Sequence, residues 1–187
     1  MPRLFAFLRA INVGGRNVTM ERLRRLFAAQ GFARVETFIA SGNVVFEAAA
    51  ADVRALERDI EDSLRAGLGY EVATFIRTEA ELAAVAAYKP FPQAELDAAA
   101  ALNVAFLHER PDAATARNLL ALRTARDDFR VRGREVYWLC RTRQSESVFS
   151  NAVLERALGL RSTMRGANTI RRLAAKYCDA KLSGSAG

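Results

Sequence analysis

Two short polar segments carry the residue types that could bind a ligand. Arginine side chains and amide groups bind anions, and glycines let a ligand approach the main chain closely. The first segment reads Arg9-Ala10-Ile11-Asn12-Val13-Gly14-Gly15-Arg16-Asn17, and the second reads Ser41-Gly42-Asn43. The predicted ligand-binding residues are Arg9, Asn12, Gly14, Gly15, Arg16, Ser41 and Asn43. The set predicts a protein that binds a ligand, for example a small anion, or a partner at an anion-tolerant polar edge. The alternative is an enzyme of unknown reaction at the same edge.

A purely structural interpretation of the same residues stays open. Glycines that follow a strand often only complete a turn, and asparagines commonly bond to nearby main chain. The first segment has one glycine pair and no Gly-Lys-Ser/Thr sequence. It is therefore neither a dinucleotide fingerprint nor a nucleotide-phosphate loop.

A second polar segment near residue 165 is a weaker candidate for binding. It contributes Arg165, Asn168 and Thr169. The alternative is that Asn168 or Thr169 caps a following helix while Arg165 lies at the surface.

The sequence shows no constellation of residues typical of catalysis, so any enzyme activity stays uncertain. His108 is the only histidine, which argues against a histidine-ligated metal site, and we expect neither metal nor cofactor. A pair of Cys140 with His108 is conceivable, but a buried strand cysteine is the better interpretation. The helical pattern places the acidic residues Glu57, Glu61 and Asp62 on a solvated face.

The composition bears on partners and compartment. A net charge of +7 invites nucleic-acid binding, but the arginines are scattered and no stacking-aromatic motif appears, so nucleic acid is possible and not favoured. No apolar run is long enough to cross a membrane. Two cysteines in strand and helix patterns suit a cytoplasmic protein. The oligomeric state does not follow from the sequence.

Strand and helix patterns alternate twice along the chain. The first half predicts strands at 4–8, 35–39, 44–46 and 71–76, with helices at 19–30 and from 53 to the glycines at 67 and 69. The second half predicts strands at 102–107, 129–132, 136–141 and 161–165, with helices from 111 to 122 and from 148 to 160. A last helix spans 169–181. The order predicts an α+β fold of two ferredoxin-like βαββαβ repeats packed together, plus a C-terminal helix.

The predicted division is an N-terminal half at 1–78, a helical connector at 79–101, a C-terminal half at 102–182 and a flexible tail at 183–187. Thr78-Glu79-Ala80-Glu81 fits a capping box at the start of the connector. Phe5 and Phe7 alternate with the other apolar residues of the first strand, so both faces of that strand must be covered. The other half of the molecule or a second chain could supply this cover.

The order of the strands also predicts where the polar segments lie. In a βαββαβ sheet the first two strands run in the same direction, so residues 9–17 and the turn at 41–43 should meet at one edge.

The two segments resemble the paired motifs R-G-I-N-V-G-G and S-G-N-V-V-F of a bacterial family catalogued as domain of unknown function 1697. The resemblance extends to Pro90-Phe91, Ser150-Asn151, Leu154-Glu155 and the loop from Thr163 to Thr169. It implies a duplicated α+β fold and no particular activity.

The chain departs from the family pattern at two places. Ala10 replaces a glycine, so we expect positive φ to be avoided there. The family tends to show T-x-R-N-W-N-T near the C-terminus, whereas this chain has Gly166-Ala167 in place of the Asn and Trp. A function of that loop in relatives could therefore be altered here.

Overall fold

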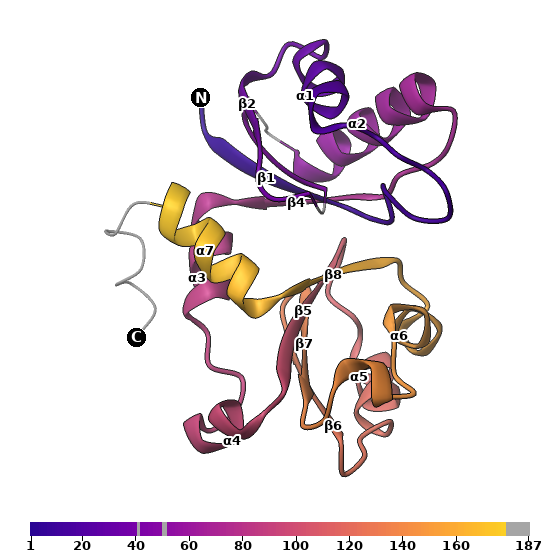
Figure 1. The fold of residues 1–187 in the computed structure, drawn as a ribbon, viewed down its shortest axis with the longest axis vertical. Coiled ribbons are helices and arrows are strands. Elements are labelled where there is room, and N and C mark those ends of the chain that lie inside the picture. The colour runs from indigo at the N-terminus through magenta and orange to yellow at the C-terminus, as the bar shows by residue number, and fades with distance from the viewer. Residues whose placement is uncertain (41, 50–51, 179–187) are drawn as a thin grey trace. The chain divides into compact units, whose positions relative to one another are not determined.

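A computed structural model describes residues 1–40, 42–49 and 52–178 of the chain. The chain divides into two compact units (Figure 1). Unit 1 contains Met1–Ala83 and the segment that begins at Tyr177, and unit 2 contains Ala84–Lys176. The predicted tail at 183–187 lies outside the described residues.

Unit 1 contains a four-stranded antiparallel sheet in the order β2-β3-β1-β4. Its elements are β1 (Arg3–Leu8), α1 (Met20–Ala28), β2 (Ala33–Thr37), β3 (Asn43–Glu47), α2 (Val53–Leu68), β4 (Thr74–Thr78) and the start of α3 (Glu79–Ala87). This is the predicted βαββαβ order. Figure 1 shows α1 and α2 on the same face of the sheet.

Local side chains fix where the helices of unit 1 begin and end. The side chain of Thr19 accepts from the main-chain N of Arg22 and caps α1. Asp52 caps α2 in the same way, and Gly69, with φ of 82°, ends it in the left-handed conformation. The predicted capping box also forms, because Glu81 accepts from the main-chain N of Thr78 at 2.8 Å.

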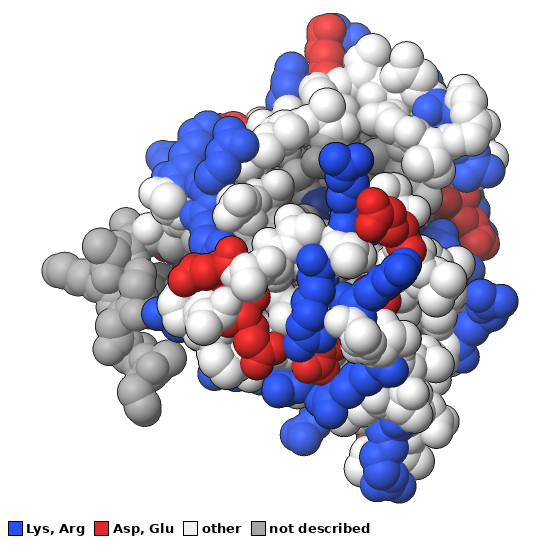
Figure 2. Space-filling view, turned by 60° about the horizontal axis from the view of Figure 1, so that its bottom comes forward, with Lys and Arg blue, Asp and Glu red and all other residues white. Residues whose placement is uncertain are grey.

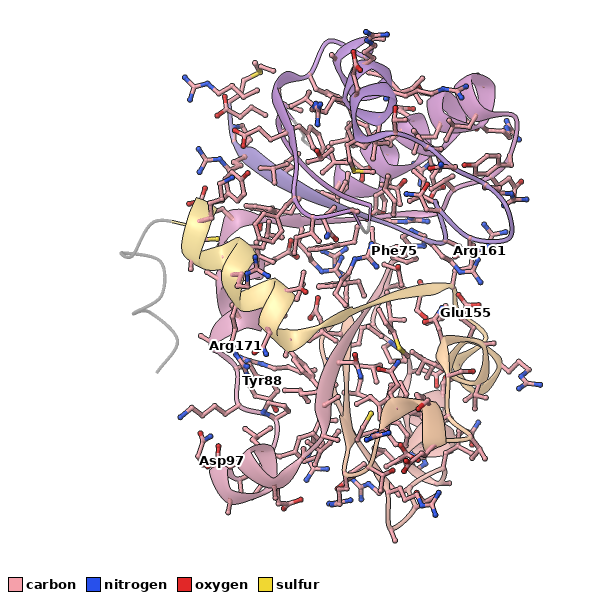
Figure 3. All side chains as sticks on the ribbon, viewed as in Figure 1. Phe75, Tyr88, Asp97, Glu155, Arg161 and Arg171 are labelled. Atoms are coloured by element: carbon pink, nitrogen blue, oxygen red, sulfur yellow. The ribbon has the colours of Figure 1, made fainter. Side chains whose placement is uncertain are left out.

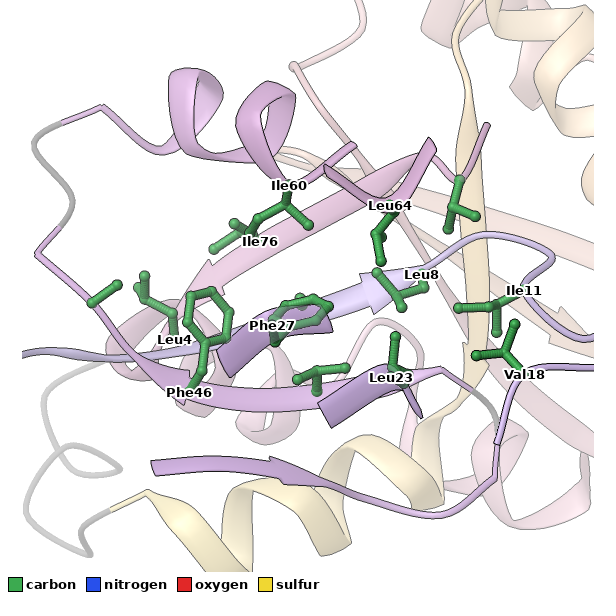
Figure 4. Packing of buried hydrophobic residues seen from close by; sticks show 14 residues of the cluster. Leu4, Leu8, Ile11, Val18, Leu23, Phe27, Phe46, Ile60, Leu64 and Ile76 are labelled. Carbon is green, nitrogen blue, oxygen red and sulfur yellow. The ribbon is translucent and has the colours of Figure 1, made fainter. Parts of the chain in front are cut away.

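The apolar core of unit 1 lies between its sheet and the two helices (Figure 4). Leu4, Ala6 and Leu8 of β1 belong to this core. Phe5 and Phe7 face the other way, as the alternation predicts, and both are buried. Part of the cover over Phe5 comes from Tyr177, whose ring meets it edge-on with centroids 6.2 Å apart.

Unit 2 repeats the plan with strand order β6-β7-β5-β8. Its elements are α4 (Gln93–Ala98), β5 (Ala101–Leu107), α5 (Ala113–Leu120), β6 (Asp127–Arg132), β7 (Glu135–Cys140), η1 (Gln144–Glu146), α6 (Asn151–Leu158), β8 (Ser162–Gly166) and most of α7 (Ala167–Tyr177). Two βαββαβ repeats and a C-terminal helix confirm the predicted fold class. The sequence patterns did not predict α4, which follows directly after the prolines Pro90 and Pro92.

The start of α7 corrects one prediction. The chain passes from β8 at Gly166 directly into the helix at Ala167, so Asn168 lies inside the first turn and is not the capping residue. Asn168 instead accepts a hydrogen bond from Nη1 of Arg171 at 3.2 Å. No loop separates the strand from the helix, as between β4 and α3 in unit 1, and a cap prediction from residue type alone could not detect this.

The prediction for the acidic face of α2 is wrong for two residues. Glu57 is buried and accepts from the main-chain N of Ile76 at 2.7 Å, and Glu61 accepts from the main-chain N of Thr74 at 2.8 Å. Each carboxylate satisfies a main-chain donor of the edge strand β4. Unit 2 repeats the second bond, since Glu155 accepts from Ser162 at 2.9 Å.

Candidate functional site

The two polar segments of unit 1 meet, as predicted from the strand order. β1 and β2 both run antiparallel to β3 and therefore share a direction. The main-chain N of Leu8, where β1 ends, donates to the carbonyl of Gly42 at 2.9 Å. We call this surface, formed by residues 9–17, 38–40, 42 and 43, the motif edge. Ser41 lies outside the described residues.

The loop after β1 presents its polar groups to solvent. Asn12, Gly14, Gly15 and Arg16 are exposed. Gly14 and Gly15 have φ of 63° and 80°, and a side chain at either position would meet nothing within 4 Å. The main chain of both glycines is therefore accessible to a ligand or partner.

Arg16 and Arg9 are held differently. The Arg16 guanidinium lies 4.2 Å from the centre of the Tyr70 ring, and the Tyr70 hydroxyl donates to the carbonyl of Ile11 at 3.1 Å. Arg9 is half-buried, and its main-chain N donates to the carbonyl of Ala73 at 2.9 Å. Tyr70 thus connects the loop to the body of unit 1.

Both asparagines bond to local main chain, as the structural interpretation expects. Asn12 accepts from the main-chain N of Val18 at 2.8 Å. Asn43 is buried, and its Nδ2 donates to the carbonyl of Phe38 at 2.9 Å. These two side chains shape the loops, and their part in binding stays a prediction.

The motif edge contains strained main chain. Ala10 has φ of 53°, so the expectation that this residue avoids positive φ is wrong. Ile39 has φ of 58° in the adjoining loop, although a β-branched residue rarely adopts that conformation. Gly42, with φ of 72°, also has no room for a side chain, because a Cβ would lie 2.9 Å from Cγ2 of Ile11. The tight approach of the two loops accounts for this geometry.

Two apolar side chains stand out from the same loops. Val13 is 53% exposed and Ile39 is 45% exposed. A partly apolar rim beside polar groups is typical of sites that bind organic ligands or proteins.

The residues of the second candidate segment differ in their exposure. Arg165 is only 8% exposed, so the alternative that placed it at the surface is wrong. Its Nη1 donates to Oγ1 of Thr163 at 2.8 Å and to the carbonyl of Met164 at 2.7 Å. Burial lowers the pKa of Arg165 to about 10, so it remains charged near neutral pH. Asn168 is exposed and Thr169 half-buried in α7.

Unit 2 has a groove that the sequence patterns did not predict. It has a volume of about 520 Å³ and runs between α4, the start of β5 and the start of α7. Its polar lining residues are Lys89, Gln93, Asp97, Asn103, Asn168 and Arg171. Figure 3 labels Asp97 and Arg171, which come from different helices. No local motif joins these residues, so only the fold reveals them.

The cysteine of unit 2 is not built for nucleophilic chemistry. Cys140 is buried in the core of unit 2, and its Sγ lies 3.7 Å from Nδ2 of Asn103. Burial raises the pKa of Cys140 to about 11, which keeps the thiol protonated. Residues 1–40, 42–49 and 52–178 contain no group of three or more side chains that could hold a metal ion.

The charged residues do not form one continuous basic face on the side seen in Figure 2, where blue and red side chains are interspersed. In unit 2, Arg141 pairs with Glu95 at 2.8 Å, and Arg123 pairs with Asp128 at 2.6 Å. Paired arginines attract phosphate backbones less strongly than a continuous basic surface would. Among the described residues, no helix has the length and apolar character needed to cross a membrane.

Comparison with known proteins gives a family and a fold. Residues 1–137 match the family described as "Protein of unknown function (DUF1697)". No curated protein matches the chain by sequence. The chain is similar to the solved structure of the conserved bacterial protein SP0830 from Streptococcus pneumoniae, with a TM-score of 0.72 and 21% identity. The similarity covers 94% of this chain and 98% of that one, and it concerns the fold alone. The chain therefore belongs to the DUF1697 family of proteins of unknown function.

Proposed function

We propose that the protein is a cytoplasmic binding protein whose motif edge takes a small anionic ligand. The observation that carries the proposal is the strained main chain of two exposed loops, at Ala10 and Ile39. Positive φ in residues other than glycine costs about 1–2 kcal/mol per residue. Such strain is commonly retained where main chain must be held in a particular shape for binding.

The chemistry of the edge supports an anion. Gly14 and Gly15 offer accessible main chain, and Arg16 supplies a fixed positive charge over Tyr70. Cation–π contact holds the guanidinium in place without neutralising it. Its charge therefore stays available to a carboxylate or phosphate.

A thermal-shift screen with phosphate, sulfate, nucleotides and carboxylates tests the proposal. We expect at least one of these anions to raise Tm in a concentration-dependent way. The Arg16→Ala variant should lose the shift. The matched control is Arg25→Ala, which removes an exposed arginine that pairs with Glu21 on α1. If no anion changes Tm, or if both variants respond like the wild type, the proposal is wrong.

A further inference from the structure

The groove of unit 2 includes a position that is occupied by a carboxylate in unit 1. The two sheets can be aligned residue by residue. Phe5 and Val104 each lie three residues before the end of the first strand of their unit. Phe5 pairs with Arg77, and Val104 pairs with Arg165, so these two arginines correspond. By this alignment Thr78 corresponds to Gly166. It follows that Glu79 and Glu81, in the first turn of α3, correspond to Ala167 and Thr169 in the first turn of α7.

In unit 1 the junction of strand and helix is filled by its own acidic side chains. Glu81 accepts from the main-chain N of Thr78 at 2.8 Å, and Glu79 lies 3.8 Å from the Arg3 guanidinium. Both carboxylates lie in the first helical turn, where negative charge is stabilised.

In unit 2 the same junction has no acidic side chain. The first turn of α7 contains no acidic residue, and a Cβ at Gly166 would meet nothing within 4 Å. The groove of about 520 Å³ lies here, and its size is within the range of small-molecule sites. The positive side chains Lys89 and Arg171 line it.

The side chain of Asn103 in β5 offers the groove a hydrogen-bond acceptor. Asn103 is only 8% exposed and lines the groove. Its Nδ2 has two long contacts, 3.7 Å to Sγ of Cys140 and 3.4 Å to Oε1 of Gln144. Among the described residues, its Oδ1 receives no hydrogen bond, so it can accept one from a molecule in the groove.

We propose that the groove of unit 2 binds a small organic carboxylate that also carries a hydrogen-bond donor, such as a hydroxy acid or an amino acid. The carboxylate takes the place that Glu79 fills in unit 1, because Ala167, which corresponds to Glu79, lines the groove together with Arg171 and Lys89. The donor group faces Oδ1 of Asn103. Asp97, the acidic residue of the lining, bonds to Nε2 of Gln93 at 2.8 Å and favours a ligand whose donor end is neutral or positive.

NMR titration of the ¹⁵N-labelled full chain tests the proposal with lactate, alanine, acetate and inorganic phosphate as probes. We expect lactate or alanine to shift resonances of residues 99–103 and 166–171. Acetate, which lacks the donor, should bind at least about threefold more weakly. If none of the probes shifts these resonances, or if phosphate binds as tightly as the best carboxylate, the proposal is wrong.

Variants of the groove sharpen the test. Arg171→Ala should weaken binding about tenfold, because a charge-assisted bond is lost. Arg172→Ala, its exposed neighbour on α7 that does not line the groove, is the matched control and should bind like the wild type. The substitution Ala167→Glu places the carboxylate of unit 1 in the lining of the groove and should abolish binding while the remaining spectrum stays folded. Unchanged binding by Ala167→Glu would overturn the proposal. Failure of the motif edge to bind anions leaves this result unaffected, since the two sites lie in different units.

Discussion

Each unit has the same main-chain hydrogen bond at the end of its first strand, but the loops around this bond differ between the units. In unit 1 the N–H of Leu8 donates to the carbonyl of Gly42, and in unit 2 the N–H of Leu107 donates to the carbonyl of Arg134, both at 2.9 Å. The bond therefore belongs to the fold and not to a particular function. In unit 2 it is flanked by the short loop 108–112 and a tight turn at Gly133-Arg134.

In unit 1 the corresponding bond lies beside a longer loop, 9–19, that contains exposed glycines and an arginine stacked on Tyr70. The three residues other than glycine with positive φ in the described chain, Ala10, Arg34 and Ile39, all lie in unit 1. Because both units bring these loops together, their contact alone does not indicate a function. The motif edge differs from the corresponding loops of unit 2 in loop length, exposure and main-chain strain.

The largest expected difference between the units concerns the acidic residue buried under β4. Glu57→Ala leaves the N–H of Ile76 without its acceptor and should lower the free energy of unfolding by about 2–3 kcal/mol. Asn151, at the corresponding position of α6, is half-buried, and Asn151→Ala should cost about 1 kcal/mol. Urea unfolding of both variants measures the difference. Equal losses would show that the buried carboxylate has no special part in unit 1.

The two junctions of strand and helix should respond differently to truncation. Glu81→Ala removes half of a capping box and should lower the free energy of unfolding by about 1 kcal/mol. Thr169→Ala, at the corresponding position of α7, should change it by less than about 0.5 kcal/mol. The same unfolding measurements decide this, and a comparable loss for Thr169→Ala would argue against an unfilled junction in unit 2.

Relief of strain should stabilise unit 1 and also test why the strain persists. Ala10→Gly should raise the free energy of unfolding by about 0.5–1 kcal/mol, because glycine adopts positive φ freely but gains entropy in the unfolded chain. Arg34→Gly relieves similar strain away from the motif edge and is the control. We expect only Ala10→Gly to weaken the thermal shift produced by an anion. If the anion-induced thermal shift is the same in both variants, the strain at Ala10 has no specific part in binding.

The smallest expected effect concerns Cys140, which should not react with a thiol reagent in the folded protein. Cys140, with its pKa raised to about 11, should resist iodoacetamide at pH 8, whereas the half-buried Cys178 should be modified. Mass spectrometry of the native protein should therefore show one added group, and urea-unfolded protein should show two. Modification of native Cys140 at a rate near that of Cys178 would contradict its burial.

The sequence contains enough local information to predict most elements of both repeats. Periodicity places the apolar stripe of α2, and caps such as Thr19 and Asp52 mark the helix starts. Strand order then predicts correctly that the two polar segments adjoin. The helix α4 was missed, since its short sequence lies next to prolines and lacks an apolar stripe.

The errors at Glu57 and Ala10 share a cause, because each depends on contacts between residues far apart in the chain. A pattern that places Glu57 on a solvated helix face cannot detect the N–H of Ile76 that needs an acceptor. Likewise, nothing in the residue type of Ala10 indicates that its loop must turn sharply to meet Gly42.

The sequence by itself determined the repeated order of strands and helices and the place where the two motifs meet, since these follow from local periodicity and strand direction. Only the tertiary structure decided that Arg165 is buried, that Glu57 and Glu61 satisfy β4, and that unit 2 has a groove. The physical reason is that burial, cavities and main-chain satisfaction depend on which distant segments pack together, and residue spacing does not contain that information.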